Sequence, residues 1–351
     1  MIKTDIIIIG AGPTGLFAVF EAGLLKLRCH LIDILPKPGG QCSELYPKKP
    51  IYDIPGHPEI LAGDLVENLL NQCSKFQPGF TLGERAEKIT KNSKGLFSVV
   101  TNKGTAHQAP VVAIAGGLGG FQPRKPNISN IESYEDKGVS YFVKDPNLYK
   151  NKNVLIAGGG DSALDWTIEL SKIASHVTLV HRRSEFRGAL DSVEQVQELK
   201  NNNKIKIITP AEVVSLMGND KLESVQIKIN NSENITLNID YFIPLFGLTP
   251  KLGPINDWGL EIEKNSILVD NTLNYQTNIP GIFAIGDIST YPGKLKLILC
   301  GFHEAAMMCQ SAYKIINPDK KFVLKYTTVS GVSGFDGSIK KAEPIVRKSI
   351  D

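Results

Sequence analysis

A short apolar run near the start of this sequence leads directly into a glycine-rich turn, and few folds accommodate that combination. Residues 6–9 read Ile-Ile-Ile-Ile, and Gly10, Gly12 and Gly15 follow with the spacing G-x-G-x-x-G. A β-branched run without polar alternation predicts a strand that is buried on both faces, as in a parallel sheet. A glycine turn that follows such a strand and opens a helix is typical of a dinucleotide site.

Each glycine of this turn has its own task in such a site. Gly10 permits the tight turn, Gly12 lets a pyrophosphate approach the backbone, and Gly15 lets helix and strand pack closely. The apolar spacing of residues 14–27 predicts the helix, whose first N–H groups and positive dipole end would face the phosphates. A generic tight turn is the alternative interpretation of the glycines taken alone.

An acidic residue follows at the distance that a dinucleotide site requires. A second strand is predicted at 29–35, and Asp33 lies 23 residues after Gly10. Its carboxylate would accept hydrogen bonds from ribose hydroxyls and would repel a 2′-phosphate. The first site is therefore predicted to prefer FAD or NAD over NADP.

The same pattern returns in the middle of the chain. Residues 154–157 read Val-Leu-Ile-Ala, residues 158–163 fit G-x-G-x-x-A, and a further strand is predicted at 177–180. The chain therefore has two β-α-β openings and two predicted nucleotide sites. The residues expected at the second turn are Gly158, Gly160, Asp161 and Ser162.

The charge at the ribose position is reversed in the second unit. At the offset that holds Asp33 in the first unit, the second has His181, followed by Arg182, Arg183 and Arg187. Guanidinium groups bind phosphate oxygens in a bidentate fork. This cluster predicts a pocket for a 2′-phosphate, and therefore NADP rather than NAD. The alternative is a solvated basic loop.

The length of 351 residues suits two domains. Residues 84–115 and 205–246 alternate charged, glycine and β-branched residues, which predicts a small antiparallel β insertion in each unit. The predicted fold is α/β, with two Rossmann-like three-layer dinucleotide-binding domains, each carrying such an insertion.

Proline-bearing segments at 121–126 and 247–254 are predicted to be the linkers between the domains. We therefore expect a FAD-binding domain formed by residues 1–121 and 250–351. Residues 122–249 would form the NADP-binding domain.

Composition excludes several other classes of protein. The net charge of +3 is too small to indicate nucleic-acid binding. No two of the five cysteines have the spacing C-x-x-C, which argues against a disulfide framework and a zinc site and favours the reducing cytoplasm. Asp5 interrupts the first apolar run, so we expect no signal peptide. No run approaches the ~18 apolar residues of a membrane span.

Together the motifs resemble the thioredoxin-reductase-like ferredoxin–NADP⁺ reductases, a group of flavoproteins with two dinucleotide sites. The resemblance covers nearly the whole chain. Besides the two glycine turns and His181-Arg182-Arg183, it rests on Gly39-Gly40-Gln41, Tyr46-Pro47, Ile51-Tyr52-Asp53-Ile54-Pro55-Gly56, Tyr141-Phe142-Val143-Lys144-Asp145 and Ile285-Gly286-Asp287.

The resemblance implies roles for residues of the first domain. Asp33 would hold the FAD ribose, and Thr14 would lie at the pyrophosphate. Gln41 and Tyr46 would contact the flavin end, with Tyr46 packed on the isoalloxazine ring. An ordinary core position is the alternative for this tyrosine.

Four further positions belong to the same implied site. Ala86 would offer backbone contacts to the adenine, and Asp287 would bind the ribityl and phosphate portion. Phe121 would lie near the flavin, and Thr328 would approach it from the C-terminal end.

The resemblance also implies the activity: electron transfer between NADP(H) and ferredoxin or flavodoxin through FAD, by a homodimer and without a catalytic side chain. Thioredoxin reductases of similar build need a C-x-x-C dithiol, but residues 132–145 contain no cysteine here. Two alternatives stay open. One is an NADPH diaphorase or disulfide reductase that uses a partner's thiols, and the other is a nucleotide-sensing or flavin-carrying protein without turnover.

Overall fold

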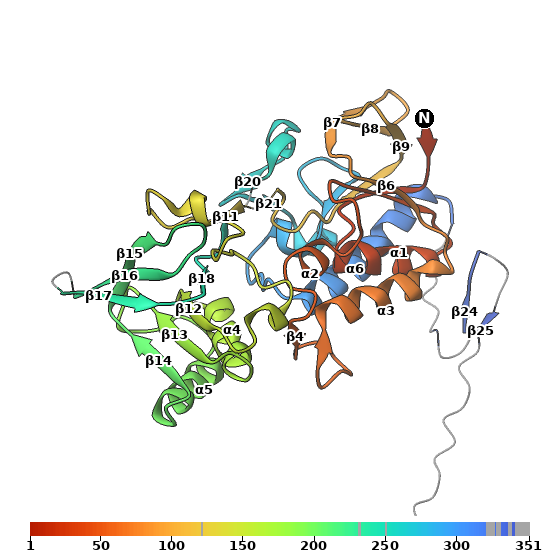
Figure 1. Cartoon of the computed structure of the whole chain (residues 1–351). Helices are drawn as coiled ribbons and strands as arrows, with labels where there is room; N and C mark the ends of the chain where they lie inside the picture. The colour runs from red at the N-terminus through yellow and green to blue at the C-terminus, as the bar shows by residue number, and fades with distance from the viewer. Residues whose placement is uncertain are drawn as a thin grey trace, which may run out of the picture. The chain divides into compact units, whose positions relative to one another are not determined.

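The chain forms two compact units in a computed structural model (Figure 1). Unit 1 comprises Met1–Gly120 with Lys251–Asp351, and unit 2 comprises Phe121–Pro250. Each junction lies one residue from the position expected from the linkers. The structure describes residues 1–120, 122–230, 233–249, 251–320, 327, 331–335 and 339–340.

Unit 1 is built on a parallel sheet of five strands in the order β22-β10-β2-β3-β6. The strands are β22 (Ile282–Ala284), β10 (Val111–Ile114), β2 (Ile6–Ile9), β3 (Cys29–Asp33) and β6 (Gly79–Leu82). The central strand β2 is buried at all four residues, because it has a neighbour on each side and a layer on each face. This is the doubly covered parallel strand that its β-branched composition predicts.

Three helices of unit 1 pack together: α1 (Pro13–Leu24), α3 (Ala62–Ser74) and α6 (Ile298–Ile316) (Figure 1). The predicted insertion is a four-stranded sheet formed by β1 (Ile2–Lys3), β9 (Ala106–Ala109), β8 (Phe97–Thr101) and β7 (Ala86–Lys91). Smaller elements are α2 (Gly40–Glu44), β4 (Pro50–Ile51), β5 (Ile60–Leu61), β20 (Ile262–Glu263), β21 (Ser266–Leu268), β23 (Ser289–Thr290), β24 (Val332–Ser333), β25 (Ile339–Lys340) and the 3-10 helices η3 (Gly253–Asp257), η4 (Asn271–Leu273) and η5 (Gly286–Ile288).

Unit 2 repeats the plan on a smaller scale. Its parallel sheet has the order β14 (Ile205–Ile208), β13 (His176–Val180), β12 (Asn153–Ala157) and β18 (Tyr241–Pro244), with helices α4 (Asp161–Ser171) and α5 (Leu190–Asn201). Its antiparallel insertion consists of β15 (Ala211–Met217), β16 (Ser224–Ile229) and β17 (Glu233–Asn238). The 3-10 helices η1 (Ile131–Tyr134) and η2 (Pro146–Tyr149) precede β12.

Some expected boundaries differ in the structure. The strand expected at 29–35 ends at Asp33. Strand β22 ends at Ala284, before Gly286, which has φ +74° and begins η5. The segments expected as plain linkers pair with each other, as β11 (Gln122–Pro123) and β19 (Leu248–Thr249) form a two-stranded antiparallel ladder.

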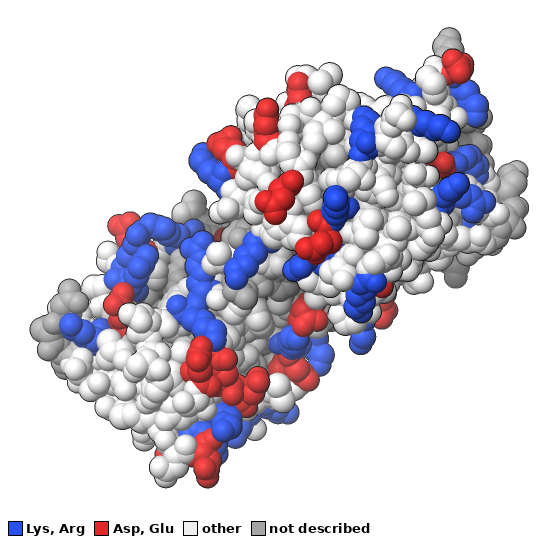
Figure 2. All heavy atoms as spheres, turned by 90° about the horizontal axis from the view of Figure 1, so that it is seen from above, with Lys and Arg blue, Asp and Glu red and all other residues white. Residues whose placement is uncertain are grey.

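The surface carries both signs of charge. Figure 2 shows basic and acidic side chains interspersed over one face, in keeping with the small net charge of +3. In the described part of the chain, no helix is both long and apolar enough to cross a membrane.

Candidate dinucleotide sites

The first glycine turn of unit 1 has room for no larger residue at two positions. Gly10 has φ +111°, and a Cβ there would lie 2.3 Å from the carbonyl oxygen of Ala115. A Cβ on Gly15 would lie 2.1 Å from the carbonyl oxygen of Gly10. The turn is therefore closed by backbone packing, as the G-x-G-x-x-G spacing predicts.

The beginning of α1 is suited to an anion. Gly12 is the N-cap, Pro13 is the first helical residue, and no side chain caps the first turn. The free N–H groups and the helix dipole therefore stay available for phosphate oxygens. A dinucleotide pyrophosphate fits this end of the helix.

Asp33 lies at the carboxyl end of β3 and faces the same turn. Its Oδ2 accepts a hydrogen bond from the N–H of Ala11 at 2.6 Å, and its Oδ1 accepts one from the N–H of Leu35 at 2.8 Å. Burial raises the pKa of this carboxyl, and the two backbone hydrogen bonds oppose the rise. Asp33 thus holds the glycine turn against β3, and each oxygen keeps a lone pair for a ribose hydroxyl.

Thr14 joins three segments of unit 1. A Cβ on Gly286 would lie 3.0 Å from the Thr14 hydroxyl oxygen, and one on Gly301 would lie 2.3 Å from it. The start of α1, the turn at η5 and the start of α6 therefore meet at this side chain. Asp287, in η5, is half-buried, and burial raises its pKa while the charges of Lys294 and Lys296 oppose the rise.

Helix α2 brings Gln41 towards the same turn. The N–H of Gly39 donates to the carbonyl of Ala11 at 2.8 Å, and a Cβ on Gly117 would lie 3.4 Å from Gln41 Nε2. Tyr46 follows α2 and is partly buried, and its hydroxyl donates a hydrogen bond to the Cys42 sulfur.

The remaining expected positions of the first site are only partly described. Ala86 is buried at the first residue of β7. Phe121 and Thr328 lie outside the described residues.

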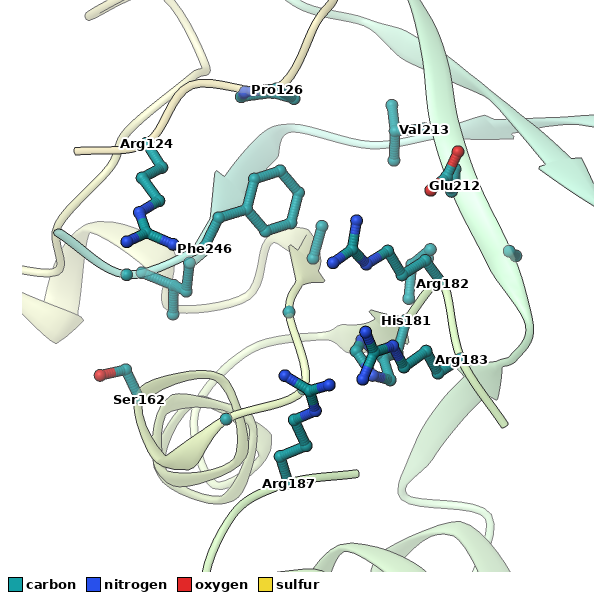
Figure 3. Close-up of a pocket in the computed structure, with 18 of the residues that line it drawn as sticks. Arg124, Pro126, Ser162, His181, Arg182, Arg183, Arg187, Glu212, Val213 and Phe246 are labelled. Carbon is teal, nitrogen blue, oxygen red and sulfur yellow. The ribbon is translucent and has the colours of Figure 1, made fainter. Parts of the chain in front are cut away.

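Unit 2 contains a cavity of about 860 Å³ at the carboxyl ends of its parallel strands. The glycine turn after β12, the start of α4 and the loop after β13 line it, and the lining includes Gly158, Gly160, Asp161 and Ser162. Figure 3 shows this cavity, with Ser162 at the start of α4. This is the edge of an open α/β sheet at which ligands bind.

The basic loop is anchored on the glycine turn. The N–H of Arg187 donates to the carbonyl of Gly159 at 2.6 Å, and the N–H of Ala189 donates to Asp161 Oδ1 at 2.7 Å. Figure 3 shows the guanidinium groups of Arg182, Arg183 and Arg187 extending into the cavity. Converging cations of this kind favour a polyanion such as a phosphate.

His181 differs from the arginines that follow it. A Cβ on Gly159 would lie 2.3 Å from its ring, and its ring centre is 5.6 Å from that of Phe186 in a stacked arrangement. Burial lowers the pKa of His181, and the charges of Arg182 and Arg187 lower it further. A hydrogen bond with the backbone of Glu185 opposes the fall, but the lowered pKa favours the neutral imidazole, and the ring supports the turn by packing.

Other lining residues were missed by sequence reasoning. Arg124, Glu212, Val213 and Phe246 also line the cavity (Figure 3). Phe246 had a usable signal, because it follows β18, the parallel neighbour of β12, and ligands gather at such strand ends. Arg124 had no such signal, because it lies before the first strand of the unit's parallel sheet, β12.

Known proteins match the chain along most of its length. Residues 4–313 match the family model of the pyridine nucleotide-disulphide oxidoreductases. The ferredoxin–NADP reductase of Flavobacterium johnsoniae is 70% identical over 350 residues and covers 100% of both chains. That of Parvibaculum lavamentivorans is 52% identical over 330 residues, which is 94% of this chain and 96% of the relative.

Solved structures agree with the fold. Thioredoxin reductase from Lactococcus lactis has a TM-score of 0.76 at 26% identity, over 90% of this chain and 100% of that one. Thioredoxin reductase from T. acidophilum has a TM-score of 0.77 at 24% identity, over 90% and 99% of the two chains, and supports the fold alone. The chain belongs to the pyridine nucleotide-disulphide oxidoreductases, and within them to the thioredoxin-reductase-like ferredoxin–NADP⁺ reductases.

Proposed function

We propose that this protein moves electrons between NADP(H) and ferredoxin or flavodoxin through FAD. The main support for this proposal is the difference in charge between the two units at the end of the second strand of each β-α-β unit. After the first glycine turn the second strand ends at buried Asp33, and after the second turn the equivalent strand leads into Arg182, Arg183 and Arg187. A carboxylate suits a free ribose, and arginines suit a 2′-phosphate.

In unit 1, FAD would be bound by residues at the end of β3, at the start of α1 and in the η5 turn that packs on α6. Asp33 would accept from the adenosine ribose, the start of α1 with Thr14 would face the pyrophosphate, and Asp287 would bind the ribityl portion. Ala86 would offer its backbone to the adenine. Gln41 and Tyr46, carried by α2 and the residues after it, would reach the flavin.

In unit 2, the start of α4 would receive the pyrophosphate of NADPH, next to Gly158, Gly160 and Ser162. The arginines of the anchored loop would hold the 2′-phosphate in the cavity of about 860 Å³. Asp161 contributes by fixing the loop through the N–H of Ala189.

The chain's own work in this reaction is binding and orientation, because hydride and electron transfer need no acid–base side chain. Bound FAD supplies the ability to take two electrons from NADPH and release them singly. Cys42, the cysteine nearest the expected flavin side chains in sequence, is buried, and burial raises its pKa to about 11. It therefore stays a thiol at pH 7, and we propose that no internal dithiol takes part.

We further propose that the protein works as a homodimer in the cytoplasm. Two competing functions remain testable. A disulfide reductase would need a partner's thiols, because residues 132–145 have no cysteine. A flavin-carrying protein without turnover would bind FAD but not exchange electrons with NADPH.

The first test is anaerobic mixing of the purified chain with a reduced nicotinamide. We expect a yellow protein whose flavin absorbance is bleached by NADPH much faster than by NADH at equal concentration. A yellow protein that neither nucleotide bleaches would support the carrier function instead. A protein with no FAD would overturn the proposal.

A further inference from the structure

A carboxylate of helix α6 is fully buried beside the expected flavin-binding turn. Glu304 is 0% exposed, and three donors converge on it. Its Oε2 accepts from the N–H of Gly286 at 2.6 Å. Its Oε1 accepts from the Tyr291 hydroxyl at 2.7 Å and from the ammonium of Lys294.

Lys294 is nearly as deeply buried as its partner. Its side chain is 5% exposed, and its ammonium lies 5.3 Å from the centre of the Tyr291 ring. Removing two charges from water is costly, and apolar residues of similar volume often serve stability equally well. We therefore expect the buried pair of Lys294 and Glu304 to have a function that two apolar residues could not perform.

The contact with Gly286 points to that task. Gly286 has φ +74° and immediately precedes Asp287, and the Ser289 hydroxyl donates to the Gly286 carbonyl at 2.9 Å. Gly286 and Gly301 both pack on Thr14. Glu304 lies one helical turn after Gly301, so α6 touches the glycine turn with one residue and the η5 turn with the other.

We propose that Glu304 is a positioning residue for FAD. By accepting the N–H of Gly286, it fixes the Gly286–Asp287 turn on α6 and so sets where the Asp287 carboxylate meets the cofactor. Lys294 is its counterion. The inference rests on the proposed function, because it takes Asp287 as a ligand of FAD.

The charges around the turn are consistent with this arrangement. Lys294 acts on both carboxylates: it is paired with Glu304, and its charge lowers the pKa of Asp287. Glu304 raises the pKa of Asp287 in turn. An unpaired Glu304 would therefore oppose the ionised Asp287, whereas the pair leaves Asp287 free to accept hydrogen bonds.

The test separates the hydrogen-bond acceptor from the buried charge. The double variants Lys294→Met/Glu304→Gln and Lys294→Met/Glu304→Leu are both neutral, but only the first keeps an oxygen for the Gly286 N–H. FAD is removed, and the affinity of each apoprotein for FAD is measured by quenching of flavin fluorescence. We expect the Leu variant to bind FAD at least about tenfold more weakly than the Gln variant. Hydrogen exchange in the peptide that spans Gly286 should be faster in the Leu variant only.

A single variant covers the case in which the Leu double variant does not fold. Glu304→Asp keeps the charge and the pairing partner, but its side chain is one methylene shorter and withdraws from Gly286. We expect about tenfold weaker FAD binding and an unchanged KM for NADPH, which binds in unit 2.

Each outcome decides a specific claim. Equal FAD affinities for the Gln and Leu double variants, or wild-type affinity for Glu304→Asp, would overturn the positioning role and leave the proposed function intact. A wild-type apoprotein that does not bind FAD would overturn the proposed function first.

Discussion

The carboxylate of Asp33 accepts a hydrogen bond from the backbone N–H of Ala11 at 2.6 Å. The residue that is expected to hold the FAD ribose therefore also holds the glycine turn that receives the pyrophosphate. One side chain sets the distance between the two halves of the binding site, because both contacts come from the same carboxyl group.

Replacing Asp33 by Ala should therefore weaken FAD binding by at least about tenfold and also lower stability, since the N–H groups of Ala11 and Leu35 lose their acceptor. The measurements are FAD titration of the apoprotein and urea unfolding. Asp5→Ala is the matched control, because Asp5 accepts the N–H of Arg28 at 2.7 Å at the other end of the sheet. A similar loss of FAD affinity in both variants would contradict the ribose contact.

Replacing Arg182 and Arg183 together by Ala should raise the KM for NADPH at least about tenfold and leave the KM for NADH nearly unchanged, because only NADPH carries the 2′-phosphate. Steady-state kinetics with both nucleotides measure this. Lys172→Ala, which removes a surface cation paired with Glu169 on α4, is the control and should change neither constant. Equal effects of the double variant on NADPH and NADH would count against the phosphate contact.

Two neighbouring glycines should respond oppositely to substitution by alanine. A Cβ on Gly159 would strike the His181 ring at 2.3 Å, whereas a Cβ on Gly160 meets nothing within 4 Å. Gly159→Ala should lower stability by about 1–3 kcal/mol through overpacking. Gly160→Ala should keep the melting temperature but raise the KM for NADPH, because its methyl group would enter the space for the pyrophosphate.

Thermal unfolding and NADPH kinetics of both variants check this separation. Wild-type stability in Gly159→Ala would show that His181 is not held under the turn. An unchanged KM in Gly160→Ala would place the pyrophosphate elsewhere.

Local spacing was enough to predict several of the elements at which the two sites are proposed. The strand at Ile6–Ile9, the place of Asp33 at the end of β3 and the place of the arginines after β13 follow from short patterns and from fixed offsets after the two glycine turns. The lowered pKa of His181 could not be predicted, because it depends on the burial of the ring and on the nearby charges of Arg182 and Arg187. Glu304 was also missed, because its partner Gly286 lies 18 residues away and only the packing of α6 on η5 brings them together.

A buried pair of histidines should make stability depend on pH. The Thr81 hydroxyl oxygen lies 2.8 Å from His30 Nε2 and 2.9 Å from His107 Nε2, so one nitrogen accepts its proton and the other donates. Burial, aided by the charge of His107, lowers the pKa of His30 from 6.5 to about 4, and burial lowers the pKa of His107 as well.

The direction of this pH dependence follows from the protonation of the histidines in the folded and in the unfolded chain. Well above pH 6.5 these rings are neutral in the folded and in the unfolded chain. Between pH 6.5 and about pH 4, His30 is protonated in the unfolded chain but stays neutral in the folded chain. The free energy of unfolding should therefore decrease as the pH is lowered from 6.5 to 4, by about 1 kcal/mol per pH unit for His30 alone. Urea unfolding at several pH values, with saturating FAD, measures it.

Two variants test whether this pair is responsible. His30→Gln should flatten the fall, and His57→Ala, which removes an exposed histidine, should keep it. The same pH dependence in wild type and His30→Gln would exclude the pair as its source.

In the proposed reaction, electrons pass from NADPH through FAD to a one-electron iron–sulfur carrier. The most direct measurement is reduction of cytochrome c by the purified protein with NADPH, with and without ferredoxin. We predict a rate that rises in proportion to added ferredoxin and is small without it. Rapid bleaching of the flavin by NADPH, with a cytochrome c rate that ferredoxin does not change, would contradict electron transfer to ferredoxin.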